Sequence, residues 1–218
     1  IHSTKIILSS KSVRNDMKKI SFKGYNRSVV VKHANHVTPL NKLHSLSYLK
    51  KKYKFKENFF FLPNHYWVHK NHLVVLKALN YISKPNFIIV STGKCYDHRD
   101  PKHFQNIKKY IKQHNLEKYF VILGIVPFKD LCSLMYHSIS VLNPSKSEGW
   151  GNSASQAALL EKKAIISNIP VHREQLNRNF IYFHPENYKQ LAKILDNNSR
   201  KKTISKLVNK NLSYNRLL

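Results

Sequence analysis

Residues 59–79, FFFLPNHYWVHKNHLVVLKAL, decide the fold class. The four apolar residues at 59–62 predict a strand that ends at Pro63-Asn64. A helix is predicted to follow, because apolar residues recur at helical spacing in LVVLKAL. An unbroken apolar strand, a short loop and a helix together form the β-α unit of a parallel sheet that is buried on both faces.

The same alternation recurs along the chain. Strands are predicted at 5–8, 28–31, 59–62, 87–91, 119–123, 140–142, 164–167 and 181–183. Helices are predicted near 10–19, 69–82, 101–115, 128–137, 152–162, 171–176 and 186–197, with a last amphipathic segment at 200–213. We therefore predict an α/β fold, a Rossmann-like parallel sheet with helices on both faces.

The domain organisation follows from residues 33–58, a basic stretch without glycine and with a single proline. We interpret this stretch as a linker or connecting segment. Residues 1–57 are then the end of a preceding domain and the linker, and residues 58–218 are a second α/β domain. The full length of 218 residues suffices for one such domain plus a fragment.

Composition narrows the class of protein. Hydrophobic residues at 42% and aromatic residues at 11% exclude a disordered chain. The longest apolar run, at 119–126, is too short to span a bilayer, and no secretory leader is recognised at the start of the sequence. Cys95 and Cys132 fit neither a disulfide framework nor a zinc site, so a cytoplasmic location is expected.

The net charge is +27, from 38 basic and 11 acidic residues. One explanation is affinity for a polyanion, either nucleic acid or an anionic membrane. The other is compositional drift in an AT-rich genome, because lysine and asparagine are abundant and spread along the whole chain. Both remain open at this point.

Three loops at the ends of predicted strands carry candidate site residues, and in doubly wound sheets ligands bind there. Lys70 lies near a helix start, where its ammonium group could meet a phosphate, although spacing alone favours one of many solvated lysines. The turn at Val126-Pro127 could present backbone groups to a flat ring. In the helix that follows, Leu131, Leu134 and Met135 are predicted to face the core.

The third loop begins SEGWGNSASQ at Ser147. Its glycines allow a close backbone approach to a ligand, and Asn152 or Ser153 is predicted to cap a helix. Gln156 lies one turn beyond Asn152 on the same face. Glu148 either accepts hydrogen bonds from ligand hydroxyls or stabilises the helix dipole by about 0.3–1 kcal/mol.

Two further groups of polar residues are given no site role. Arg173 and Glu174 are neighbours that do not face each other on a helix, so packing against neighbouring elements is their expected role. His65, His69 and His72 have helical spacings but no carboxylate partner. No metal site is predicted from them.

Together these segments resemble the C-terminal, nucleotide-sugar-binding domain of the family 4 (group 1) glycosyltransferases, which have the GT-B fold. The resemblance covers about residues 59–197 and rests on LPNHYWVHKNH and on SEGWGNSASQA followed by KKAIISNIPVHREQ. Residues 1–33 resemble the end of the N-terminal, acceptor-binding domain of that family.

The resemblance implies retaining transfer of a sugar from a UDP- or GDP-linked donor, without a required metal or other cofactor. Glu148 would contact the hydroxyls of the donor sugar, and Lys70 the pyrophosphate; these two residues are the implied catalytic pair. Backbone groups at Trp150, Gly151 and Asn152 would meet the sugar or phosphate. Val126 and Pro127 would meet the base.

The sequence departs from the family pattern at two positions. Gln156 replaces the second glutamate of the motif, which binds the ribose hydroxyls, but keeps an acceptor oxygen. His65 stands where most relatives have an arginine that joins the lysine on the pyrophosphate. We expect this weaker, titratable donor to lower donor affinity or make it pH-dependent.

The expected partners are the nucleotide-sugar donor and a glycan or lipid-linked acceptor, with contact at the inner face of an anionic membrane. Because GT-B chemistry takes place between two domains, the chain by itself is expected to bind donor without transferring sugar. Two alternatives stay open: a non-catalytic basic protein that binds polyanions, and an inactive truncated glycosyltransferase copy. No specific nucleic-acid partner is expected, because no nucleic-acid-binding fold signature is recognised.

Overall fold

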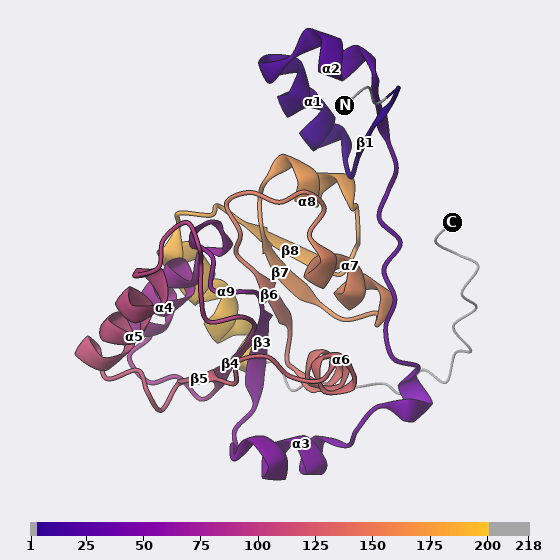
Figure 1. Cartoon of the computed structure of the whole chain (residues 1–218). Coiled ribbons are helices and arrows are strands. Elements are labelled where there is room, and N and C mark those ends of the chain that lie inside the picture. The colour runs from indigo at the N-terminus through magenta and orange to yellow at the C-terminus, as the bar shows by residue number, and fades with distance from the viewer. Residues whose placement is uncertain (1–3, 201–218) are drawn as a thin grey trace.

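A six-stranded sheet forms the centre of the molecule, with the strand order β5-β4-β3-β6-β7-β8 (Figure 1). The computed structural model describes residues 4–200. All neighbouring strands of this sheet are parallel, as the sequence predicted. The strands are β3 (Phe59–Pro63), β4 (Ile88–Thr92), β5 (Phe120–Ile122), β6 (Val141–Asn143), β7 (Ala164–Ser167) and β8 (Phe180–Phe183).

Helices cover both faces of the sheet, which confirms the predicted Rossmann-like arrangement. Helices α4, α5 and α9 contribute to one buried cluster, and α3, α6 and α7 to a second. The helices around the sheet are α3 (Leu46–Tyr53), α4 (His72–Tyr81), α5 (His103–Gln113), α6 (Phe128–His137), α7 (Asn152–Leu159), α8 (Pro170–Glu174) and α9 (Tyr188–Arg200).

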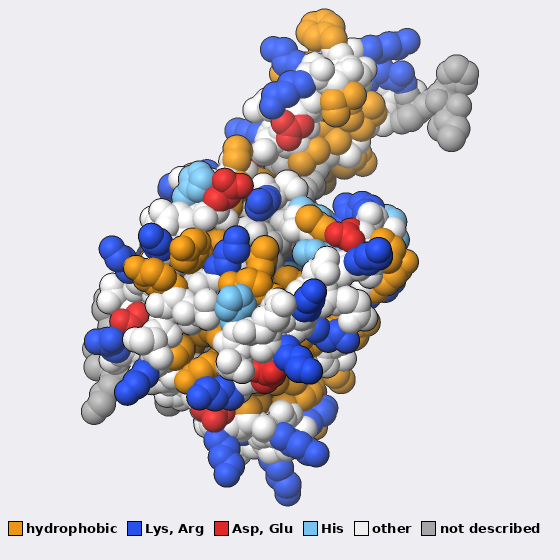
Figure 2. Space-filling model, turned by 90° about the vertical axis from the view of Figure 1, so that its left-hand side faces the viewer, with side chains coloured by type: hydrophobic (Ala, Val, Ile, Leu, Met, Phe, Trp, Pro, Cys, Tyr) orange, Lys and Arg blue, Asp and Glu red, His pale blue; other side chains and the backbone are white. Residues whose placement is uncertain are grey.

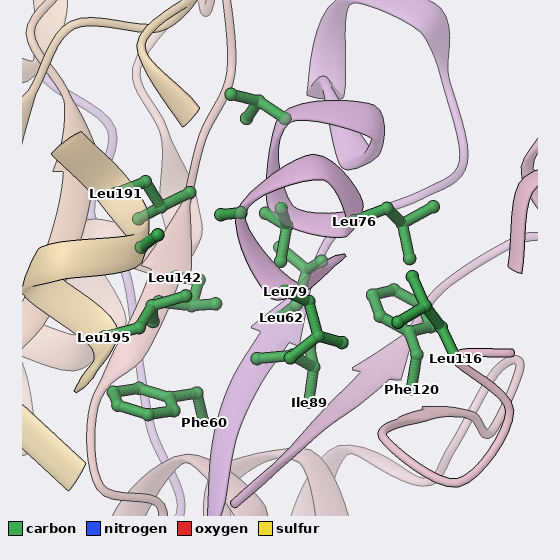
Figure 3. Close-up of a cluster of buried hydrophobic side chains, with 14 of the residues drawn as sticks. Phe60, Leu62, Leu76, Leu79, Ile89, Leu116, Phe120, Leu142, Leu191 and Leu195 are labelled. Atoms are coloured by element: carbon green, nitrogen blue, oxygen red, sulfur yellow. The ribbon is translucent and has the colours of Figure 1, made fainter. Parts of the chain in front are cut away.

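The aromatic run of β3 explains why both faces are covered. Successive side chains of a strand point to opposite faces, so Phe60 and Leu62 enter the cluster under α4 and α9, and Phe59 and Phe61 enter the other. Figure 3 shows the first cluster, where Phe60 and Leu62 lie among leucines from α4 and α9. A strand with four consecutive buried apolar residues needs cover on both faces, and the two layers of helices supply it here.

The N-terminal unit, residues 4–30, lies above the carboxyl ends of several strands, next to α8 (Figure 1). It contains β1 (Ile6–Leu8), α1 (Lys11–Ile20), α2 (Phe22–Asn26) and β2 (Ser28–Val30). The two strands pair in parallel, and the Ser10 side chain accepts the backbone N–H of Val13 to cap α1.

The connecting segment, residues 31–57, runs along the side of the sheet past α7 and α6 (Figure 1). It includes a 3-10 turn, η1 (Leu40–Lys42), and α3, a helix that the sequence did not predict. Helix α3 packs against α6 through buried Leu49. The buried carboxylate of Asp130 in α6 accepts Lys52 Nζ at 2.5 Å and Tyr53 Oη at 2.6 Å.

Outside the connecting segment, most predicted elements occur within a few residues of their expected bounds, with two differences. The helix expected near 69–82 begins at His72, because a separate 3-10 turn, η2 (Val68–Lys70), precedes it. The short helix α2 was not predicted. Most of the amphipathic segment predicted at 200–213 falls outside the described residues.

The strand order contains a switch point between β3 and β6. After β3 the chain continues to β4 and β5 on one side, and then crosses to β6 on the other. The loops that follow β3 and β6 therefore diverge from adjacent strand ends and leave a crevice between them. We call residues 64–71 the β3 loop and residues 144–151 the donor loop, because the latter resemble the donor loop of the glycosyltransferase family named above.

Candidate active site

A cavity of about 490 Å³ opens at the carboxyl ends of the central strands, above the switch point. The β3 loop and the donor loop line two of its sides, and the turns after β4 and β5 line a third. The site residues predicted from the sequence that line it are His65, Lys70, Val126, Glu148, Trp150, Gly151, Asn152 and Gln156.

Lys70 and Glu148 form an ion pair across the switch point. Lys70 Nζ donates to Glu148 Oε1 at 2.7 Å and to Oε2 at 2.8 Å. The side chains are only 13% and 8% exposed, so Lys70 is not a solvated surface lysine. The sequence placed each residue at the site but did not predict that they bond to each other.

The charge of Glu148 is maintained despite its burial. Burial by itself would raise the pKa of Glu148, but the nearby ammonium of Lys70 and the hydroxyl of Ser145 hold the pKa below its ordinary value. Ser145 Oγ donates to Glu148 Oε1 at 2.7 Å. Helix α7 has no acidic residue in its first turn, and the Glu148 carboxylate is bonded to Lys70 and Ser145.

Hydrogen bonds between the two loops hold Lys70 in place. Asn71 adopts a left-handed conformation (φ 57°), and its Nδ2 donates to the carbonyl oxygens of Pro144 at 3.0 Å and Pro185 at 2.8 Å. The backbone N–H of Lys146 donates to the carbonyl of His69 at 2.8 Å. The β3 loop and the donor loop are therefore one connected structure.

Asp97, from the loop after β4, supports the β3 loop from the other side. Its Oδ2 accepts the backbone N–H of Val68 at 3.1 Å, and its Oδ1 accepts Arg99 Nε at 3.1 Å. Burial would raise the pKa of Asp97, but these hydrogen bonds and the charge of Arg99 lower it to about 2. The carboxylate is therefore ionised throughout the physiological range, and the turn that carries Lys70 has a permanent anchor.

His65 presents a neutral donor to the cavity. Its Nδ1 accepts the backbone N–H of Lys94 at 2.8 Å, so the ring proton of the neutral form must lie on Nε2. Burial, followed by the charges of Lys70 and Lys94, lowers the pKa of His65. Near pH 7 this position therefore supplies an uncharged N–H group.

The start of α7 differs from the predicted cap. Neither Asn152 nor Ser153 caps the helix; Gly151 occupies the cap position with φ 87°, and no side-chain cap bond is made. A Cβ on Gly151 would lie 3.1 Å from Nε2 of the buried His172, so a larger residue would be both strained and crowded. The uncapped helix start faces the cavity, where it can receive an anionic oxygen.

Gln156, in α7, also lines the cavity and lies one helical turn beyond Asn152. Its Nε2 donates to the backbone carbonyl of His36 in the connecting segment at 3.4 Å. The ring of His36 lies 4.8 Å from that of Phe128, between centroids. The side-chain N–H of Gln156 thus donates to the protein backbone, and the side-chain oxygen stays available as an acceptor.

Some residues differ from their predicted places. Pro127 is the residue before α6 and is not among those that line the cavity, whereas Ile125, 77% exposed, does line it. Leu134 and Met135 are buried as predicted, and Leu131 packs against the same cluster while it also lines the cavity. Sequence reasoning also missed Gly93, although a glycine directly after a buried strand was a usable signal.

The family of the chain follows from a match that covers most of its length. Residues 44–211 match the model of the family described as glycosyl transferases group 1. The chain belongs to this family. The O-antigen chain mannosyltransferase RfbU of Salmonella typhimurium (strain LT2) is 26% identical over 145 residues, which is 66% of this chain and 39% of RfbU.

Solved GT-B glycosyltransferases share the fold. Anabaena Alr3699/HepE, solved with UDP and glucose, has a TM-score of 0.77 at 15% identity, over 91% of this chain and 54% of HepE. A glycosyltransferase from Rickettsia africae has a TM-score of 0.73 at 21% identity, over 90% of this chain and 53% of its own. This group 1 chain therefore spans about half the length of these structures, and less of RfbU.

The side chains and helices of residues 4–200 also bear on metal binding and on a membrane crossing. No group of three or more histidine, cysteine, aspartate or glutamate side chains in that range has an arrangement that could hold a metal ion. Among the helices of the same residues, none combines the length and the apolar character that a membrane crossing requires.

Proposed function

We propose that this chain is the nucleotide-sugar-binding half of a retaining glycosyltransferase that works without a metal or other cofactor. The observation that carries the proposal is the buried Lys70–Glu148 pair at the switch point. A cation and a carboxylate held together in a cavity above a Rossmann-like sheet suit a ligand that has both a diphosphate and sugar hydroxyls.

In the proposed mechanism, breaking the bond between the sugar and the nucleoside diphosphate builds negative charge on the leaving phosphate. Lys70, the Nε2–H of His65 and the open start of α7 stabilise that charge without a metal. The lysine ammonium has three donors, so it can hold a phosphate oxygen while it keeps one bond to Glu148. Glu148 accepts hydrogen bonds from the sugar hydroxyls.

The remaining lining residues support a contact with the nucleoside. Val126 and the exposed Ile125 provide a surface for the base, and Gln156 offers its oxygen to the ribose hydroxyls. The donor is a UDP- or GDP-sugar. Similarity to a mannosyltransferase of O-antigen synthesis supports a polysaccharide or lipid-linked acceptor. The residues that bind the acceptor are assigned to the N-terminal domain.

The proposal is tested by calorimetric titration of the chain with UDP-glucose and GDP-mannose at two salt concentrations. We expect one saturable site for one of the two nucleotides, with affinity that changes little with salt. The rival function, polyanion binding through the +27 charge, predicts instead steeply salt-dependent binding of DNA or RNA and no saturable nucleotide site. That second pattern would contradict the proposal.

Donor binding is expected to strengthen as the pH falls below about 6.5, the ordinary pKa of histidine. Because the pKa of His65 is lowered in the folded protein, the ring is neutral at pH 7 and gains its charge only in acid. The charge of a bound diphosphate favours the protonated ring, so affinity rises as the ring protonates. His69, whose pKa is also lowered by burial, lies in the same loop but does not line the cavity.

The measurement is the Kd of UDP-glucose or GDP-mannose between pH 5.5 and 8, because sugar diphosphates lack a titrating terminal phosphate in this range. His65→Gln should remove most of the pH dependence, and His69→Gln serves as the matched control. Equal pH dependence in the wild type and in His65→Gln would show that His65 is not the titrating group.

We also propose that the chain is cytoplasmic and meets the inner face of an anionic membrane through the N-terminal unit. Ile20 is 83% exposed and Phe22 is 65% exposed, beside Lys18, Lys19 and Lys23. Figure 2 shows hydrophobic and basic side chains together on this part of the molecule, at the top of the view. Exposed apolar and basic groups in one patch suit an anionic bilayer surface.

Vesicle sedimentation tests this contact. The double variant Ile20→Ser with Phe22→Ser should bind vesicles containing phosphatidylglycerol about tenfold more weakly than the wild type, because two apolar side chains are lost. Tyr81→Ser, an exposed aromatic residue on α4, is the control and should change little. Unchanged binding by the double variant would exclude this patch as the membrane contact.

A further inference from the structure

The N-terminus of α1 is bonded to a carboxylate from the other part of the molecule. The backbone N–H of Lys11 donates to Glu174 Oε2 at 2.9 Å, and that of Ser12 donates to Oε1 at 2.5 Å. Helix α1 has no acidic residue in its own first turn. Glu174, at the end of α8, therefore supplies both the acceptor oxygens and the negative charge that this helix start favours.

A second contact joins the same two parts of the chain. Ser9 Oγ, just before α1, donates to the backbone carbonyl of Gly149 at 2.8 Å. Gly149 lies between Glu148 and Trp150, both of which line the cavity. The N-terminal unit thus touches the donor loop directly, at the residue next to the carboxylate that pairs with Lys70.

The segment that carries Glu174 holds the donor loop from its other side. Gln175 Nε2 donates to the carbonyl oxygens of Trp150 and Gly151. His172 is fully buried against Gly151, and its Nδ1 bonds to the carbonyl of Ser167 at 2.8 Å. Three residues within one short segment therefore contact either the donor loop or the N-terminal unit.

We propose that Glu174 is a positioning residue that couples the seating of the N-terminal unit to the geometry of the donor loop. Glu174 does not line the cavity, so it acts through α1, Ser9 and the loop rather than on the ligand. The ligand part of this inference rests on the proposed function. If the α1–Glu174 contact strengthens ligand binding by some factor, thermodynamic linkage requires that the bound ligand strengthen the α1–Glu174 contact by that same factor.

The first experiment measures the contact without any ligand. In the 218-residue chain, Glu174→Gln and Glu174→Ala should speed amide exchange at Lys11 and Ser12 about tenfold, as expected for a lost charged partner at a helix start. The amide NMR signals of Gly149, Trp150 and Gly151 should shift or broaden in the same variants. Glu117→Gln, an exposed glutamate near β5, is the control and should change neither set.

A double variant tests whether the two contacts act together. If the Ser9 and Glu174 contacts together hold the N-terminal unit in one position, losing either contact releases the unit. The double variant Ser9→Ala with Glu174→Gln should then shift the donor-loop amide signals by less than the sum of the two single variants. Faster exchange at Lys11 and Ser12 with unmoved signals at residues 149–151 would overturn the coupling. So would strictly additive effects of the two substitutions.

The second experiment adds UDP or GDP. Glu174→Gln should weaken nucleotide binding about threefold to tenfold. In the wild type, bound nucleotide should slow amide exchange at Lys11 and Ser12 by about the same threefold to tenfold. Weaker binding without slowed exchange would overturn the coupling. If the wild-type chain binds no nucleotide, the proposed function fails, and the ligand-free amides still decide whether Glu174 positions the loop.

Discussion

Lys70→Ala should weaken the binding of nucleoside diphosphate by about 10- to 100-fold, as expected for the loss of a charged hydrogen bond worth about 1.5–3 kcal/mol. The Lys70 ammonium is nearly buried and held at the cavity by the β3 loop. Its removal also leaves Glu148 as an unpaired buried carboxylate, which repels the phosphate and raises the pKa of that carboxyl. Calorimetry with UDP and GDP measures the change.

Two matched variants separate this effect from a general loss of charge. Lys77→Ala removes an exposed lysine from α4 and should leave the affinity unchanged. Glu148→Gln frees Lys70 from its partner, so UDP or GDP should bind as tightly as before or more tightly, while a sugar nucleotide binds more weakly. If Lys70→Ala and Lys77→Ala behave alike, Lys70 is not the diphosphate ligand.

Gly93→Ala should lower the free energy of unfolding by about 3–5 kcal/mol, because it combines backbone strain with a backbone clash. Gly93 follows β4 at φ 137°, and a Cβ there would lie 2.5 Å from the carbonyl oxygen of Asn64. That carbonyl belongs to the backbone of the β3 loop, which cannot rotate away as a side chain would. The substitution should therefore also displace His65 and weaken donor binding.

Gly124→Ala is the matched control for this prediction. Gly124 also has a left-handed conformation (φ 68°) and accepts the backbone N–H of Gly93, but a Cβ there meets nothing within 4 Å. Its cost should be only about 1 kcal/mol, from conformation alone. Urea unfolding of both variants makes the comparison. Equal losses would show that the close approach of Gly93 to the β3 loop does not matter for stability.

The sequence predicted the fold well, because the strands are buried on both faces. The run FFFL has no polar residue to mark an exposed side, and only a sheet covered by two helical layers accommodates it. Helix α3 was missed because a lysine run, Lys50 to Lys52, conceals its short apolar stripe. Its stability comes from Leu49 and from the contact of Lys52 and Tyr53 with Asp130, about 80 positions away.

The site was predicted residue by residue but not in its connections. Lys70 and Glu148 were both placed at strand ends, but their ion pair depends on β3 and β6 being neighbours in the sheet, which local spacing does not encode. The role of His65 depends on a bond from the backbone of Lys94, and the contact of Gln156 depends on the path of the connecting segment. Such long-range pairings follow from topology, so a local pattern cannot supply them.

The most direct test of the central claim is a map of where nucleotide binds. Amide NMR spectra of the labelled chain, titrated with UDP and with GDP, locate the contact residue by residue. We expect saturable shifts that are largest in the turns around the cavity, residues 63–70, 92–94, 125–126 and 148–156, with little change when salt is raised. An absence of shifts, or shifts spread over the lysine-rich surface that vanish in salt, would contradict the claim that this chain is a nucleotide-sugar-binding half.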